Sequence, residues 1–78
     1  MKIIHINVNG IAAKKFKMIQ FIQELNPDIV EIVETCLKGN EELKINGYDW
    51  VGENFSGAAR GNRGVGFLIK IGIKYKII

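Results

Sequence analysis

Three polar side chains stand where two apolar, strand-like runs of the sequence end. Asn7 and Asn9 close the run at residues 2–8, and Glu34 closes the run at residues 29–33. In α/β sheets, binding sites are built at the carboxyl ends of strands. A carboxylate and carboxamides suit Mg²⁺, which takes one or two protein carboxylates and completes its shell with water and phosphate oxygens. The sequence therefore predicts a metal and phosphate site, with Mn²⁺ as a possible substitute for Mg²⁺.

Each of these residues also has a purely structural interpretation. Asn9 precedes Gly10, and Asn-Gly is a common turn pair, so Asn9 could serve the turn alone. Asn7 could be a solvated strand end, and Glu34 a surface carboxylate. Because side chains alternate across a strand, Asn7 and Asn9 point to opposite faces unless the strand bends. One of them is therefore expected to reach the site directly while the other shapes the turn.

The elements that would position these side chains form a βαβ unit. Residues 2–8 read as a strand and residues 12–26 as a helix, whose apolar positions Met18, Phe21, Ile22 and Leu25 share one face. Pro27 ends the helix, because the residue before a proline is pushed out of the α region. Residues 29–33 are nearly all apolar, as in a strand buried on both faces of a parallel sheet. Parallel strands would bring both polar ends to one edge.

The second half of the chain reads as further strands. We expect strands at residues 48–51, 64–70 and 73–78, with a glycine-rich loop at residues 53–63. In that loop Arg60, Asn62 and Arg63 could contact phosphates, or simply be solvated. Tyr48 and Trp50 could stack on a base or form an aromatic core face.

Composition excludes several classes of protein. With 78 residues, 47% of them hydrophobic, the chain is at most one small globular domain. A net charge of +3 is compatible with a polyanionic partner without demanding one. The single cysteine, Cys36, rules out an intramolecular disulfide and favours a reducing, intracellular compartment, cytoplasmic or nuclear. No apolar run approaches the ~20 residues of a membrane helix, so no membrane partner is expected.

The order of four short motifs resembles a known superfamily. These are Ile-His-Ile-Asn-Val-Asn-Gly at residues 4–10, Pro-Asp-Ile-Val-Glu-Ile-Val-Glu-Thr at 27–35, Gly-Tyr-Asp-Trp-Val-Gly at 47–52 and Gly-Val-Gly-Phe-Leu-Ile at 64–69. Together they are similar to the opening of the endonuclease/exonuclease/phosphatase superfamily. That superfamily includes apurinic endonucleases, DNase I-like nucleases and the endonuclease domains of non-LTR retrotransposons. The four motifs resemble those of the retrotransposon domains most.

The resemblance implies a fold, an activity and site roles. It implies the N-terminal part of a four-layer α/β sandwich and a Mg²⁺-dependent hydrolase that cleaves DNA phosphodiester bonds. Glu34 takes the place of the metal-ligating glutamate, Asn7 that of the asparagine that arranges metal and phosphate, and Asn9 a position that supports the metal site. Departures are Ile6 and Val33, where relatives often have Trp and Gln.

The remaining catalytic residues of the superfamily would lie in a C-terminal half that this sequence does not contain. His5 cannot replace them, because it lies within the first strand. We therefore expect residues 1–78 to be the N-terminal fragment of one endonuclease domain, inactive alone and completed by that missing half. The alternative is a small non-catalytic α/β module for binding or interaction, for which Glu34 would be irrelevant.

Overall fold

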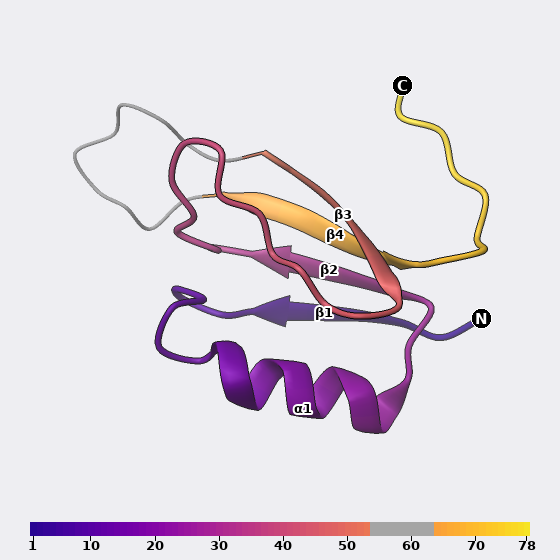
Figure 1. The fold of residues 1–78 in the computed structure, drawn as a ribbon, viewed down its shortest axis with the longest axis horizontal. Helices are drawn as coiled ribbons and strands as arrows, with labels where there is room; N and C mark the ends of the chain where they lie inside the picture. The colour runs from indigo at the N-terminus through magenta and orange to yellow at the C-terminus, as the bar shows by residue number, and fades with distance from the viewer. Residues whose placement is uncertain (54–63) are drawn as a thin grey trace.

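A four-stranded mixed sheet with one helix on it makes up the described part of the chain, residues 1–53 and 64–78 of a computed structural model (Figure 1). The strands are β1 (Ile3–Asn7), β2 (Ile29–Val33), β3 (Tyr48–Glu53) and β4 (Val65–Lys70), and the helix is α1 (Lys15–Leu25). Their order across the sheet is β1-β2-β4-β3. The predicted α/β class is confirmed.

The first half of the chain is the predicted βαβ unit. β1 and β2 are parallel neighbours, in a register that runs from Ile3 opposite Ile29 to Asn7 opposite Val33. The helix α1 makes the connection between them. β4 then pairs antiparallel with both β2 and β3. The carboxyl ends of β1 and β2 therefore lie at the same edge of the sheet.

Helix α1 is shorter than predicted at its start and ends as predicted. Residues 11–14 form a turn, closed by a bond from Lys14 N to Ile11 O of 2.9 Å, and no side chain caps the helix. The expected start at residue 12 is therefore wrong, and α1 begins at Lys15. Asn26 ends it in the left-handed conformation, where its N–H donates to Ile22 O at 2.8 Å.

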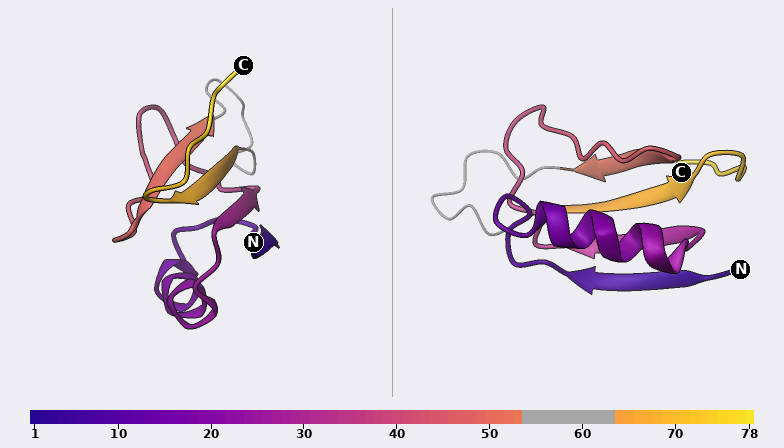
Figure 2. Two further views of the ribbon diagram at one scale, coloured as in Figure 1. Left: turned by 90° about the vertical axis from the view of Figure 1, so that its right-hand side faces the viewer. Right: turned by 60° about the horizontal axis from the view of Figure 1, so that its bottom comes forward.

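The core lies on one face of the sheet. Val30, Ile32 and Leu68 point to this face and are completely buried. Figure 2 shows α1 and the connection after β2 on the same side of the sheet. They bring Ile22 and Leu43 into the same apolar cluster. Burying a side chain of this size stabilises a fold by roughly 1.5–3 kcal/mol, so this layer holds the strands together.

The opposite face of the sheet is open, which corrects the prediction that β2 is buried on both sides. Ile3, Val65 and Phe67 point to this face and remain 61%, 40% and 38% exposed. Burial along β2 alternates, with Val30 and Ile32 buried between partly exposed neighbours. The alternation arises because no element among the described residues covers this second face.

Trp50 belongs to the core side of the sheet, as the aromatic core-face interpretation predicts. Its ring packs against Gly52 and Gly66, and a Cβ atom at either glycine would overlap it. Trp50 also packs against the main apolar cluster. The two glycines are therefore required by close approach of the indole.

The predicted strand at residues 73–78 does not form. After β4 the chain turns at Gly72, which has a φ of +102°, and Ile73 N donates to Lys70 O at 3.1 Å. The tail then leaves the sheet (Figure 1). β4 already pairs with β2 on one side and β3 on the other, so a continuing strand has no place beside it. No helix in the described part of the chain is long and apolar enough to cross a membrane.

Candidate functional site

The edge at the carboxyl ends of β1 and β2 is held by backbone hydrogen bonds beyond the strands themselves. Val8 N donates to Val33 O at 3.2 Å, Gly10 N to Glu34 O at 2.8 Å, and Ile11 N to Thr35 O at 3.0 Å. The turn after β1 is thus tied to the segment after β2. This arrangement fixes the backbones that carry Asn7 and Glu34.

Asn7 and Glu34 meet at this edge, as the sequence predicts. Asn7 Nδ2 donates to Glu34 Oε2 at 2.8 Å. The amide oxygen of Asn7 accepts from Asn9 N at 3.2 Å, so both ends of the amide are held. Among the described residues, no hydrogen bond engages Oε1 of Glu34. Within residues 1–53 and 64–78, the pair therefore presents an oriented carboxylate oxygen, Oε1, that has no hydrogen-bond partner.

A left-handed backbone at Glu34 makes this contact possible. Asn7 pairs with Val33, so these two residues share the open face, and regular alternation would send the next residue to the covered face. Glu34 instead has a φ of +57°, which lets its carboxylate reach Asn7. A non-glycine residue in this conformation costs about 1–3 kcal/mol. Sequence periodicity carries no signal for this reversal.

Asn9 enters the site through its backbone. It has a φ of +47°, in the turn that precedes Gly10, and its N–H is the donor that holds the amide oxygen of Asn7. The structure therefore supports the turn role that Asn-Gly suggests. The further expectation that Asn9 supports a metal stays a prediction.

Thr35 and Gly64 support the edge from beneath, and sequence reasoning gave neither a role. Thr35 is 1% exposed, and its hydroxyl accepts from Leu37 N at 3.4 Å. Its own N–H donates to Gly64 O at 3.2 Å. A Cβ atom on Gly64 would overlap the Thr35 hydroxyl, and Gly64 has a φ of +114°. The glycine that opens the Gly-Val-Gly motif was the available signal.

His5 and Glu31 form a second polar pair between β1 and β2. His5 Nδ1 and Glu31 Oε1 lie 2.6 Å apart on the open face, with side chains 59% and 40% exposed. This explains the one charged residue in the otherwise apolar run of β2. It also agrees with the structural role expected for His5, whose ring is bound to Glu31 and not to the Asn7–Glu34 pair.

Two lysines lie near Asn7. Lys14 and Lys17 line a groove of about 550 Å³ together with Asn7 and Phe21, between β1 and α1. Their charge favours an anion close to the pair. Arg60, Asn62 and Arg63, the other candidate phosphate contacts, lie outside the described residues.

The donor set fits a cation that needs few protein ligands. In the described part of the chain, no three His, Cys, Asp or Glu side chains converge as a metal cluster. One carboxylate with an adjacent carboxamide matches Mg²⁺, which keeps several waters, and does not match zinc, which takes four nitrogen or sulfur ligands in structural sites. Cys36 is partly buried, and its thiol donates to Glu34 O at 3.7 Å.

Comparison with known proteins gives one kind of match. No family model matches the chain, and no curated protein matches its sequence. Among solved structures, the chain is similar to the AP endonuclease LMAP from Leishmania major, with 26% sequence identity and a TM-score of 0.73. The alignment covers 91% of this chain and 24% of that chain, so residues 1–78 span about a quarter of its length. The fold therefore matches a fragment of an AP endonuclease fold.

Proposed function

We propose that residues 1–78 are the N-terminal part of a Mg²⁺-dependent endonuclease domain that hydrolyses DNA phosphodiester bonds. The observation that carries this proposal is the 2.8 Å contact between Asn7 and Glu34 at the carboxyl ends of neighbouring parallel strands. The similarity to part of an AP endonuclease supports the reaction class. The order of the sequence motifs favours a retrotransposon-type domain within that class.

In this proposal each residue has a separate task. Glu34 offers the cation its Oε1, which no other described residue bonds, and Asn7 holds that carboxylate in place while its own amide is held by Asn9. A bound divalent ion would supply Lewis-acid polarisation of the phosphate. Lys14 and Lys17 attract the phosphodiester towards the groove that Asn7 lines.

The same proposal requires that the chain be inactive alone. His5 is the chain's single histidine, and its Nδ1 lies 2.6 Å from Glu31. It is therefore not poised to activate water at Glu34. Loss of general acid–base catalysis typically lowers a rate by ~10²–10⁴. We therefore expect purified chain not to nick supercoiled plasmid in Mg²⁺ or Mn²⁺, and nicking that disappears with Glu34→Gln would refute the inactive assignment.

Metal binding tests the site itself. Calorimetric titration with MgCl₂ would compare the wild type with Glu34→Gln and with Glu24→Gln, a matched change on an exposed position of α1. The wild type and Glu24→Gln are expected to bind one weak equivalent, and Glu34→Gln to lose it. Equal binding by all three proteins would show that Glu34 holds no metal.

The open face supports a second candidate function, an interaction module. Ile3, Val65 and Phe67 expose apolar surface there, which marks docking sites on many proteins. This function predicts partner capture that Glu34→Gln leaves unchanged, in a protein that binds no Mg²⁺. The titration above separates the two candidates.

A further inference from the structure

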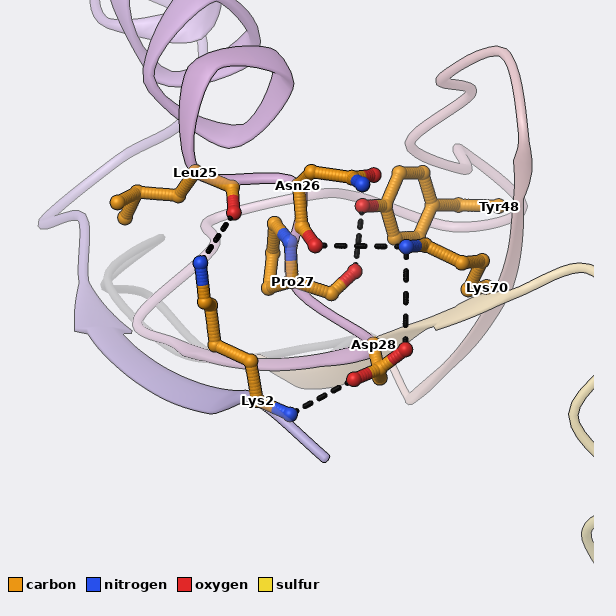
Figure 3. Close-up of polar contacts among 7 residues, drawn as sticks. All are labelled: Lys2, Leu25, Asn26, Pro27, Asp28, Tyr48 and Lys70. Carbon is orange, nitrogen blue, oxygen red and sulfur yellow. Dashed lines mark hydrogen bonds and ion pairs between the residues drawn. The ribbon is translucent and has the colours of Figure 1, made fainter.

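A dense polar cluster lies at the end of the sheet opposite to Asn7 and Glu34. Figure 3 shows the side chains of Lys2, just before β1, of Tyr48 in β3 and of Lys70 in β4 converging on the short segment between α1 and β2. We call this group the Asp28 cluster; it consists of Lys2, Leu25, Asn26, Pro27, Asp28, Tyr48 and Lys70. None of it was expected from the sequence, because Lys2, Tyr48 and Lys70 are far in the chain from residues 25–28 and from one another.

The cluster satisfies the carbonyl groups where α1 ends. Lys2 Nζ donates to Leu25 O at 2.7 Å, and Tyr48 OH donates to Pro27 O at 2.6 Å. Lys70 Nζ donates to Asn26 O at 3.3 Å. The last carbonyls of a helix lack partners within it and carry partial negative charge, which cations favour. Since the last turn of α1 has no basic residue, the cations come from Lys2, just before β1, and from Lys70 of β4.

Asp28 connects β2 to the strands on both sides. Its carboxylate accepts from Lys2 N at 2.7 Å, and its own N–H donates to Lys2 O at 2.8 Å. On the other side its carbonyl accepts from Lys70 N at 2.9 Å, and its carboxylate lies 3.8 Å from Lys70 Nζ. The hydrogen bond from Lys2, together with the Lys70 charge, lowers the pKa of Asp28. The chain just before β1 is thus joined to the sheet at Asp28.

The apolar residues of β1 and β2 do not define their register by themselves. Four of the five residues of β2, and three of the five in β1, are Ile or Val. A slip of two residues would keep every side chain on its own face. It would also move Asn7 by about 6.6 Å along Glu34, at about 3.3 Å per residue. β1 is an edge strand of the described sheet, with β2 as its neighbour, so nothing on its other side opposes a slip.

Polar pairs between the two segments define the register that the apolar residues of β1 and β2 leave open. Lys2 bonds Asp28 and His5 bonds Glu31, and both pairs are separated by 26 residues in sequence. That separation is the register of the ladder itself, in which Ile3 lies opposite Ile29. A slip would break the His5–Glu31 side-chain pair and would move Lys2 away from Asp28, where the backbone N–H of another residue would then lie. Lys2 and Asp28 fix the start of the ladder, and Asn7 and Glu34 meet at its end.

We propose that Asp28 is a positioning residue for the candidate site: by binding the backbone of Lys2 it holds the start of β1 in the register that the His5–Glu31 pair selects, and so holds Asn7 against Glu34 at the far end of the strand. This inference rests on the proposed function for its importance, because a misplaced Asn7 matters only if the pair binds a ligand. The effect of Asp28 on the contact between Asn7 and Glu34 does not depend on a metal, and it can be measured in the metal-free protein.

The test follows the contact between Asn7 and Glu34 by NMR. In the wild type, the side-chain amide of Asn7 is expected to show a nuclear Overhauser effect to the Glu34 side chain. Asp28→Ala is expected to lose this signal while α1 remains helical by circular dichroism. Asp28→Asn keeps an oxygen that accepts from Lys2 N and should restore it. Asp49→Ala, which removes an exposed aspartate from β3, is the matched control and should retain it.

A second pair of variants decides the matter if Asp28→Ala does not fold. Lys2→Pro removes the N–H that Asp28 binds, whereas Lys2→Ala keeps it and loses only the ammonium group. The signal is expected to be lost in Lys2→Pro and kept in Lys2→Ala. An undiminished signal in folded Asp28→Ala, or in Lys2→Pro, would overturn the positioning role. Failure of the wild type to bind MgCl₂ would instead count against the proposed function alone.

Discussion

The two ends of the parallel pair β1–β2 are built in opposite ways. At the amino ends, the Asp28 cluster takes donors from Lys2, just before β1, from Tyr48 in β3 and from Lys70 in β4, and they bond the carbonyls of residues 25–27 at and after the end of α1. At the carboxyl ends, a side-chain hydrogen bond joins Asn7 to Glu34, the backbone is left-handed at Asn9 and at Glu34 itself, and no other described residue bonds the second oxygen of Glu34. At the amino ends the polar groups bond to one another and to the backbone, whereas at the carboxyl ends Glu34 keeps one oxygen that no other described residue bonds. This difference is the reason that the proposed function is assigned to the carboxyl ends.

The largest effect is expected from breaking the support of the carboxyl end. In Gly64→Ala, the new methyl group overlaps the Thr35 hydroxyl and the residue is forced to keep a φ of +114°. Backbone strain of this kind costs about 1–3 kcal/mol, and the overlap adds to it. Gly72→Ala is the control, since its φ of +102° is similar and nothing lies within 4 Å. Thermal unfolding should show the greater loss of stability for Gly64→Ala. Equal losses in the two variants would show that the overlap with Thr35 does not destabilise the fold.

A smaller effect is expected at the amino end. Tyr48→Phe removes the hydrogen bond to Pro27 O and should lower the free energy of unfolding by about 1 kcal/mol. Tyr75→Phe, a change in the exposed part of the tail, should leave it unchanged. Chemical denaturation of the two variants measures the difference. If Tyr48→Phe is as stable as the wild type, the hydrogen bond from Tyr48 to Pro27 O does not contribute to the stability of the fold.

Alkaline pH tests the same bond without a mutation. Burial raises the pKa of Tyr48 above its usual 10.0, with a further contribution from the Asp28 charge. Because the folded pKa is raised, the stability that Tyr48 contributes is fully present below pH 10 and is lost as pH rises beyond it. Denaturation midpoints measured from pH 8 to 11 should fall for the wild type more than for Tyr48→Phe. Parallel curves would contradict this.

Acid should weaken the amino end through Asp28. The backbone hydrogen bond from Lys2 lowers the pKa of Asp28 below 3.8, so its stabilising contribution is present above that pH and is lost as pH falls through the lowered pKa. Asp28→Asn removes this titration. Between pH 5 and 2, the wild type should therefore lose more stability than Asp28→Asn, as followed by circular dichroism. An identical acid profile would show that the carboxylate is not held in its charged form.

The sequence was sufficient for what depends on local pattern. Apolar periodicity and Pro27 predicted the βαβ unit, and parallel strand ends predicted that Asn7 and Glu34 would meet. The sequence was insufficient for contacts that depend on how β1 and β2 are aligned. The His5–Glu31 pair and the contacts of Asp28 exist only once β1 and β2 are aligned, and no local pattern encodes that alignment.

Backbone reversals and strand order set the second limit. The left-handed turn at Glu34 sends its side chain to the open face, against simple alternation. The apolar residues of the tail have the composition of a strand, yet β4 is already paired on both sides, so the chain cannot fold back beside it, and residues 73–78 form no strand. Roles in metal binding and catalysis remain predictions that residues alone do not decide.

The most direct test of the proposed metal site at Asn7 and Glu34 is to determine which end of the sheet binds a divalent cation. Mn²⁺ is paramagnetic and broadens the NMR signals of nearby nuclei, so substoichiometric MnCl₂ in a ¹⁵N-labelled sample maps the ion onto the chain. We expect broadening centred on Asn7, Gly10 and Glu34, abolished by Glu34→Gln and unaffected by Glu24→Gln. Broadening centred on Asp28, or spread over all exposed carboxylates and unchanged by Glu34→Gln, would contradict it.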